Sequence, residues 1–202
     1  DVLKDELVKI NPKIFGDVYS VPKEAPELRD LEEYSAILDA SGKNKEFGIG
    51  LSITLGERET ALNEALKLQT AYRNDLTKGF EWISREGAVQ LNSIQYLYSE
   101  DKVLKALMGT LAGVGMSAEI LSDEKPVLGL SRLHKDIKVS GRTTRPMVER
   151  GVNLGKALAE CSANFGGQGG GHDIAAGAMI PYEAKDQFLH LVDEMIEYQL
   201  NN

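Results

Sequence analysis

The stretch GGGHDIAAGA, residues 169–178, places three glycines directly before a histidine and follows them with small residues. Glycine has no Cβ and reaches positive φ freely, so another group can approach its main chain closely. Successive backbone N–H groups in a concave loop bind phosphate oxygens, and His172 adds a ring whose charge changes near neutral pH. The stretch therefore predicts a glycine-rich loop over residues 166–171 that wraps an anion.

Other interpretations of this loop fit its residues less well. The glycine run does not end in Gly-Lys-Ser/Thr as a P-loop does. It also lacks the last glycine of the dinucleotide fingerprint and follows a helical pattern rather than a strand. A tight turn beside a core histidine is the remaining alternative. Six of the seven positions from 166 to 172 are Gly or His, which is an entropically costly composition for a simple turn.

The bulk composition is that of a packed domain. The chain has 202 residues, 42% of them hydrophobic and 27% charged, which is within the globular range. Cys161 is the single cysteine, so there is no internal disulfide framework and a reducing, cytoplasmic location is expected. The sequence contains no apolar run long enough for a membrane span and no signal peptide. It starts at Asp1 rather than at a methionine, which favours a segment of a longer protein.

The charge is unevenly distributed. The whole chain carries a net charge of −8, yet residues 131–156 carry seven Lys or Arg against two acidic residues, a net +5. The remainder is therefore −13. A local basic stretch on an acidic body is typical of a single anion-binding face, although a solvated surface is the other interpretation.

Apolar periodicity predicts an α/β fold. Strands alternate with helices in the second half of the chain, which favours a layered α/β architecture. The domains are expected at residues 1–26 (an extended lead-in), 27–87 (a helical connecting region) and 88–202. Helices are predicted over 27–40, 57–85, 102–111, 145–162 (interrupted near Gly151 and Gly155) and 182–200. Strands are predicted over 17–21, 89–98, 127–130, 137–140 and 175–180.

The chain is poor in hydrolytic machinery. Its three histidines, His134, His172 and His190, are scattered, and no pair has a metal-ligand spacing. No serine lies in a Gly-x-Ser-x-Gly elbow. Cys161 falls in a helical pattern and is interpreted as a small core residue. No catalytic or metal-binding residue is therefore expected in this chain.

The motif GGGHDIAAGA, preceded by VSGRTTR (residues 139–145) and VNLGKALAECSANFGG, resembles the C-terminal DHH-associated domain of DHH phosphoesterases. The resemblance is strongest to archaeal RecJ-like proteins, including the GINS-associated nuclease. It extends upstream through LRDLEEYSAILDASGK and ETALNEALKLQTAYRNDL, which are similar to the segment between the two lobes of that family. It implies a mixed sheet flanked by helices, preceded by a helical connecting region.

The resemblance also implies a division of roles. In the family, an N-terminal DHH lobe holds Mn²⁺ and the C-terminal lobe binds the nucleic-acid substrate. The Asp-His-His motif is absent here, so this chain is expected to be the substrate-binding part of a metal-dependent single-strand exonuclease. The residues implied to bind substrate phosphate are Gly169, Gly170, Gly171, His172, Ser140 and Arg142, with Arg145 as a further candidate.

Two other functions remain open at this point. One is a non-catalytic replication scaffold that binds GINS, for which the acidic remainder and the long helix from Glu57 are suited. The other is a small-substrate phosphodiesterase acting on nano-RNA or cyclic dinucleotides, which shares the GGGH motif. The expected partner is single-stranded DNA or RNA, and no membrane partner is expected. Alanyl-tRNA synthetases carry a related glycine motif, but the upstream segments here do not resemble them.

Overall fold

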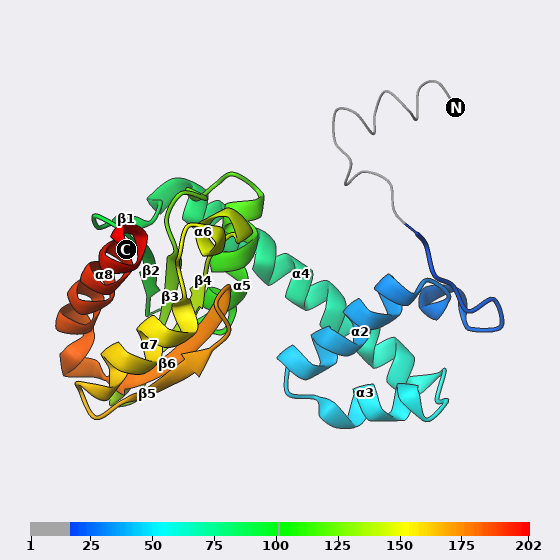
Figure 1. Ribbon diagram of the computed structural model, residues 1–202. Helices are drawn as coiled ribbons and strands as arrows, with labels where there is room; N and C mark the ends of the chain where they lie inside the picture. The colour runs from blue at the N-terminus through cyan, green and yellow to red at the C-terminus, as the bar shows by residue number, and fades with distance from the viewer. Residues whose placement is uncertain (1–16, 101) are drawn as a thin grey trace, which may run out of the picture. The chain divides into compact units, whose positions relative to one another are not determined.

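The computed structural model describes residues 17–100 and 102–202, and these form two compact units (Figure 1). The helical unit ends at Asn74 and the sheet unit runs from Asp75 to Asn202. This division falls inside α4, Thr60–Glu86. The boundary expected near residue 87 coincides with the end of that helix and stays a prediction. The first sixteen residues of the expected lead-in lie outside the described residues.

Between residue 17 and α4, the structure has three short helical elements: η1 (Pro26–Leu28), α2 (Leu31–Lys43) and α3 (Phe47–Thr54). Asp30 caps α2, because its Oδ1 accepts hydrogen bonds from the backbone N–H groups of Glu32 and Glu33. The predicted strand over 17–21 does not form, and its only pairing in the described residues is the isolated bridge Ser20–Asp30. The short apolar run GIGLSITLG, residues 48–56, supplies most of α3. The core of this unit comprises Leu28, Ile37, Ile53, Ala61, Leu62 and Ala65.

The sheet unit contains a six-stranded mixed sheet in the order β1-β2-β3-β4-β6-β5. All neighbouring strands are antiparallel except β2 and β3, which are parallel. The strands are β1 (Val89–Gln90), β2 (Gln95–Ser99), β3 (Val127–Leu133), β4 (Asp136–Arg142), β5 (Gln168–Gly171) and β6 (Ala175–Pro181). The predicted α/β class, with a mixed sheet flanked by helices, is confirmed.

The strand predicted over 89–98 is broken into β1 and β2. Asp193, buried on the last helix, explains the break, because its carboxylate accepts hydrogen bonds from the backbone N–H groups of Asn92, Ser93 and Ile94. These amides are thereby satisfied by a carboxylate rather than by a neighbouring strand. A residue 99–101 positions away thus fixes the turn.

Helices pack on both faces of the sheet. They are α5 (Lys102–Ser117), α6 (Arg145–Glu149), α7 (Leu154–Ala163), η2 (Tyr182–Ala184) and α8 (Lys185–Asn201). The predicted interruption of the 145–162 helix is confirmed by the gap between α6 and α7, where Gly151 has a φ of 107°. No helix in the described ranges is long and apolar enough to cross a membrane.

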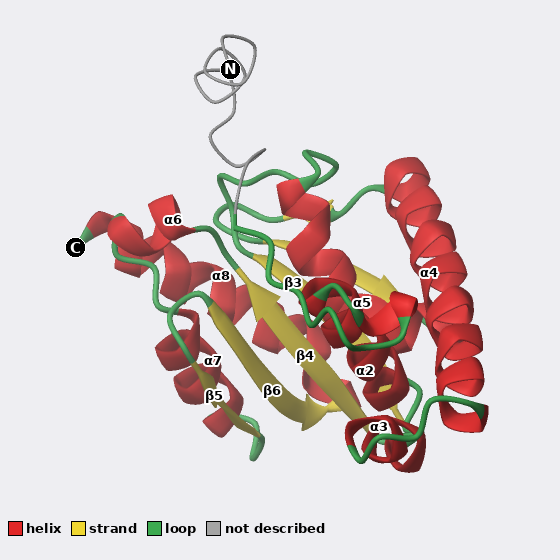
Figure 2. Cartoon of the chain, turned by 90° about the vertical axis from the view of Figure 1, so that its right-hand side faces the viewer, coloured by secondary structure: helices red, strands yellow, loops and turns green. Residues whose placement is uncertain are grey.

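The main core lies on the sheet face that α7 and α8 cover. We call this the closed face. Its buried residues include Ile137, Val139, Leu158, Ile180 and Phe188. The opposite face carries α5, which packs on β2, β3 and β4. Figure 2 looks onto β4 and β6 from the side of this second face.

Candidate functional site

The glycine stretch is a strand rather than the predicted loop. Gln168–Gly171 forms β5, the edge strand of the sheet, and pairs antiparallel with β6. Only residues 172–174 connect the two strands. The backbone N–H of His172 donates to the Ala175 carbonyl oxygen (2.9 Å), and that of Gly167 donates to the Ser162 carbonyl oxygen (3.0 Å). These two amides are therefore used within the fold and form no concave anion nest.

The physical reason for the correction is close packing against α7. A Cβ at Gly169 would lie 2.4 Å from the Leu158 carbonyl oxygen, and one at Gly155 would lie 2.5 Å from the Gly171 carbonyl oxygen. Backbone meets backbone at both places, so no side chain can replace these glycines without a shift. Part of the glycine motif thus exists to bring α7 against β5.

The rest of the motif lies on the opposite, open face. Successive strand residues point to alternate faces, and the pairing register aligns three rows of residues across β4, β6 and β5. We define the open face by these rows, none of whose members is buried. The first row is Arg142 and Ala175, the second is Ser140, Gly177 and Gly170, and the third is Lys138, Met179 and Gln168.

The middle row has almost no side chains. A Cβ at Gly170 would meet nothing within 4 Å, so the surface above β5 is open at this point. Ser140 borders the glycines and lies against α5, where a Cβ at Gly109 would approach Ser140 Oγ to 3.3 Å. The middle row is therefore a shallow floor with α5 along one side.

Arg142 extends along α5. A Cβ at Gly113 would lie 3.7 Å from Arg142 Cγ, and the Arg142 Nη1 donates to the Gly141 carbonyl oxygen at 2.8 Å. Arg142 makes no ion pair within the described ranges. The positive charge of its guanidinium is therefore available to a ligand. The N–H groups that are not bonded to Gly141 remain as donors, and the planar guanidinium holds them in a fixed geometry.

His172 and Arg145 lie at the same end of the open face as Arg142. The His172 N–H bond to Ala175 brings the histidine beside the residue that pairs with Arg142. His172 is exposed. Arg145 Nη1 lies 3.9 Å from Asp173 Oδ2, in a largely exposed pair beside the histidine. The structure thus brings together Gly170, His172, Ser140, Arg142 and Arg145, whereas Gly169 and Gly171 contact α7.

Two other cations of the basic stretch, Arg132 and Lys156, have partners away from this end of the open face. The Arg132 guanidinium lies over the Tyr182 ring, 3.7 Å from its centroid, and its Nη1 is 3.3 Å from Glu100 Oε1. The Tyr98 hydroxyl, first, and Arg132, second, hold the pKa of Glu100 below its usual value. Lys156 faces Glu160 at 4.0 Å. Arg132 is therefore a structural residue of the closed face.

None of the seven residues expected to bind phosphate lies in the third row of the open face, which is formed by Lys138, Met179 and Gln168. A signal for Lys138 was present, because Asp136, Lys138, Ser140 and Arg142 alternate with apolar residues or glycine along β4. Gln168 and Met179 join them only through the β5–β6 register. Met179 is 38% exposed although it lies in the middle of a strand pair.

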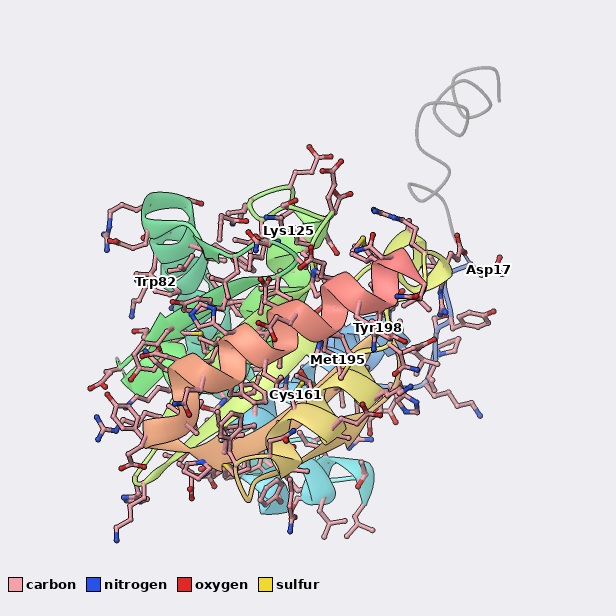
Figure 3. All side chains as sticks on the ribbon, turned by 60° about the vertical axis from the view of Figure 1, so that its left-hand side comes forward. Asp17, Trp82, Lys125, Cys161, Met195 and Tyr198 are labelled. Atoms are coloured by element: carbon pink, nitrogen blue, oxygen red, sulfur yellow. The ribbon has the colours of Figure 1, made fainter. Side chains whose placement is uncertain are left out.

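Cys161 is confirmed as a core residue. It is fully buried on α7, beside α8 (Figure 3). Burial, and to a smaller extent Glu160, raises the pKa of its thiol to about 11, so it is protonated at neutral pH and is a poor nucleophile. Among the residues that the structure describes, no three His, Cys, Asp or Glu side chains converge as metal ligands do. These residues therefore do not fit the Mn²⁺ ions that the resemblance implies for a DHH lobe.

Comparison with known proteins identifies the family. Residues 94–198 match the model of the DHHA1 domain, which is more than half of the chain. The chain therefore belongs to the DHHA1, or DHH-associated, domain family. It is also similar to the uncharacterized protein MJ0831 of Methanocaldococcus jannaschii, with 34% identity over 175 residues. That match covers 86% of this chain and 37% of the relative. The archaeal relative supports the archaeal RecJ-like interpretation.

Solved structures share the fold. RecJ from Thermus thermophilus, crystallised with Mn²⁺, superposes with a TM-score of 0.65 and 16% identity over 82% of this chain and 24% of that chain. CDC45 from Entamoeba histolytica superposes with a TM-score of 0.62 and 11% identity, over 97% of this chain and 44% of that chain. At these identities the likeness concerns the fold alone. The chain spans less than half of the length of each of these relatives.

Proposed function

We propose that this chain is the substrate-binding part of a RecJ-like, metal-dependent phosphodiesterase and that it holds a single nucleic-acid strand through its phosphates. The observation that carries the proposal is the position of Arg142, His172 and Arg145 at one end of a face whose middle row has almost no side chains. Guanidinium groups bind phosphate oxygens through two parallel hydrogen bonds. The glycines of the middle row leave room for a nucleic-acid backbone to lie against the sheet.

The proposed role is positioning. A phosphate bound by Arg142 and His172 is fixed relative to the sheet, and the loss of orientational freedom on binding is a large part of what such a domain contributes to a reaction. In a nuclease that uses two metal ions, the ions stabilise the attacking and leaving oxygens. The described residues provide no metal cluster, so in this proposal hydrolysis depends on a DHH lobe that holds Mn²⁺.

Fluorescence anisotropy with labelled single-stranded oligonucleotides across a salt series tests the proposal. Each neutralised phosphate of a single strand contributes about −0.7 to the slope of log affinity against log salt, so three contacts give a slope near −2. Arg142→Ala and His172→Ala should each weaken binding. An affinity that does not change with salt, or variants that bind as the parent does, would contradict the proposal.

A second candidate function, a replication scaffold that binds GINS, is favoured by one feature of the helical unit. Three large apolar side chains recur at four-residue spacing along α3 and its C-cap residue: Phe47, Leu51 and Leu55. They are 68%, 60% and 79% exposed. Contiguous exposed apolar side chains mark protein-binding surfaces. Co-purification of GINS subunits with the parent but not with Leu51→Glu would support this function, and equal recovery would exclude this surface.

A further inference from the structure

We infer that the open face binds three successive phosphates of one extended strand, with Lys138 and Gln168 forming a subsite for the third. This inference rests on the proposed function, because it assigns the ligand of the same face. It specifies the number of phosphates that the face binds. It also adds a binding residue, Lys138, which lies four positions from Arg142 on β4.

The spacing of the rows supports this register. Residues two positions apart on a strand are separated by about 6.8 Å. An extended polypeptide spans about 3.5 Å for each residue, which has three backbone bonds. A nucleotide has six backbone bonds, so at the same length per bond an extended nucleic-acid backbone spans about 7 Å for each phosphate. An extended nucleic-acid strand that runs along the β-strands can therefore place one phosphate at each row.

The three rows differ in what they offer. The first row provides Arg142, with His172 beside it, and the third provides the Lys138 ammonium and the Gln168 amide. Between them, Ser140 is the only side chain with a donor, because Gly177 and Gly170 complete the middle row. A central phosphate can thus lie close to the sheet while cations hold its two neighbours.

Lys138 is suited to this role. It is exposed, and it makes no ion pair in the described part of the chain. Its neighbours across the sheet are Ser131 and Met179, neither of which is charged. Lys138 therefore has no internal partner that a phosphate would have to displace.

The face ends after the third row. The next residue on the same side of β4 is Asp136, which pairs with Pro181 and is exposed. A carboxylate repels a phosphate that would continue along the strand. The site therefore has three phosphate positions and a defined end, which a surface of scattered lysines does not have.

Calorimetric titration of 5′-phosphorylated thymidylates with one to four phosphates tests this register on the 202-residue chain. Affinity should rise up to three phosphates and gain nothing from the fourth. Lys138→Gln should lower the affinity for the three-phosphate ligand about two- to five-fold, which is the range for an exposed charge pair. It should leave the one-phosphate ligand unaffected and reduce the salt slope for the longer ligands by about 0.7.

Two further variants sharpen the test. Lys67→Gln removes the same charge from an exposed position on α4 and should produce no length-dependent loss. Asp136→Asn should allow the fourth phosphate to add affinity. If all ligands bind but Lys138→Gln weakens them equally or not at all, the three-phosphate register is wrong and the proposed function stands. If no thymidylate binds, both fail.

Discussion

A Cβ at Gly169 would lie 2.4 Å from a carbonyl oxygen of α7, whereas a Cβ at Gly170, the next residue along β5, would meet nothing within 4 Å. The first position belongs to the closed face and the second to the open face. One short glycine run thus has two purposes. On one side it lets a helix approach the sheet, and on the other it leaves the sheet uncovered.

The same contrast holds for the charged residues of the sheet unit. Arg132 is engaged by Tyr182 and Glu100, while Arg142 has no acidic partner among the described residues. Residue type therefore does not separate the structural role of Arg132 from the binding role proposed for Arg142. The two roles are separated by the face of the sheet on which the strand register places each residue. Substitutions on the two faces should therefore have different effects.

The largest effect is expected on the closed face. Gly169→Ala should lower the free energy of unfolding by about 3 kcal/mol or more, because the added methyl group meets α7 backbone and cannot be relieved by a rotamer change. Urea denaturation measures this. Gly113→Ala, in α5, is the matched control and should be neutral or stabilising by about 0.5–1 kcal/mol. Equal effects of the two changes would show that packing against α7 is not the reason for Gly169.

A pH effect follows from the desolvation of the closed face. The pKa of Cys161 is about 11 in the folded chain and about 8.5 when unfolded. Above pH 8.5 the unfolded state loses its proton first, so stability is full below that pH and falls as the pH rises to 11, by about 2–3 kcal/mol. Unfolding curves from pH 8 to 11 for the parent and Cys161→Ala measure the difference. A parent and variant that lose stability in parallel would refute it.

The two arginines provide a reciprocal test. Arg142→Ala should weaken single-strand binding about ten-fold through the loss of charge-assisted hydrogen bonds and leave the unfolding midpoint nearly unchanged. Arg132→Ala should do the reverse, lowering the unfolding midpoint through the loss of its ring contact and ion pair while binding stays as in the parent. Anisotropy and urea denaturation on both variants test this pair. A stability loss for Arg142→Ala equal to that for Arg132→Ala would remove the distinction.

The smallest effect concerns the end of the open face. Asp173→Asn removes the charge that faces Arg145 at 3.9 Å and keeps an acceptor for the Ile174 N–H. Binding should become tighter by about 0.2–1 kcal/mol, as expected for an exposed pair, and the gain should disappear at high salt. Weaker binding by this variant would place Arg145 outside the site.

The sequence predicted the family, the α/β class and the elements with strong periodicity. Its helices and strands beyond residue 126 lie close to β3, β4, α6, α7, β6 and α8, because their apolar residues recur at helical or strand spacing. The break between β1 and β2 was not predictable, since it depends on Asp193, about a hundred residues further along the chain. Such a contact leaves no local pattern.

The candidate site shows where local reasoning ends. The residues of GGGH were found from composition, but their loop conformation was wrong, because the absence of side chains reflects the approach of α7 and not only ligand binding. Lys138 was missed because a lysine in a basic stretch attracts no notice until the strand register places it on the same face as Arg142. The assignment of the seven candidate residues to a ligand stays a prediction.

The most direct test of the account is a ¹H–¹⁵N NMR titration of the chain with an unlabelled single-stranded oligonucleotide. The account predicts chemical-shift changes at Lys138, Ser140, Arg142, Gly170 and Gly177, and none at Ala157 or Leu158 of α7. Shifts concentrated on α7, or on α3 with the open face unperturbed, would contradict it.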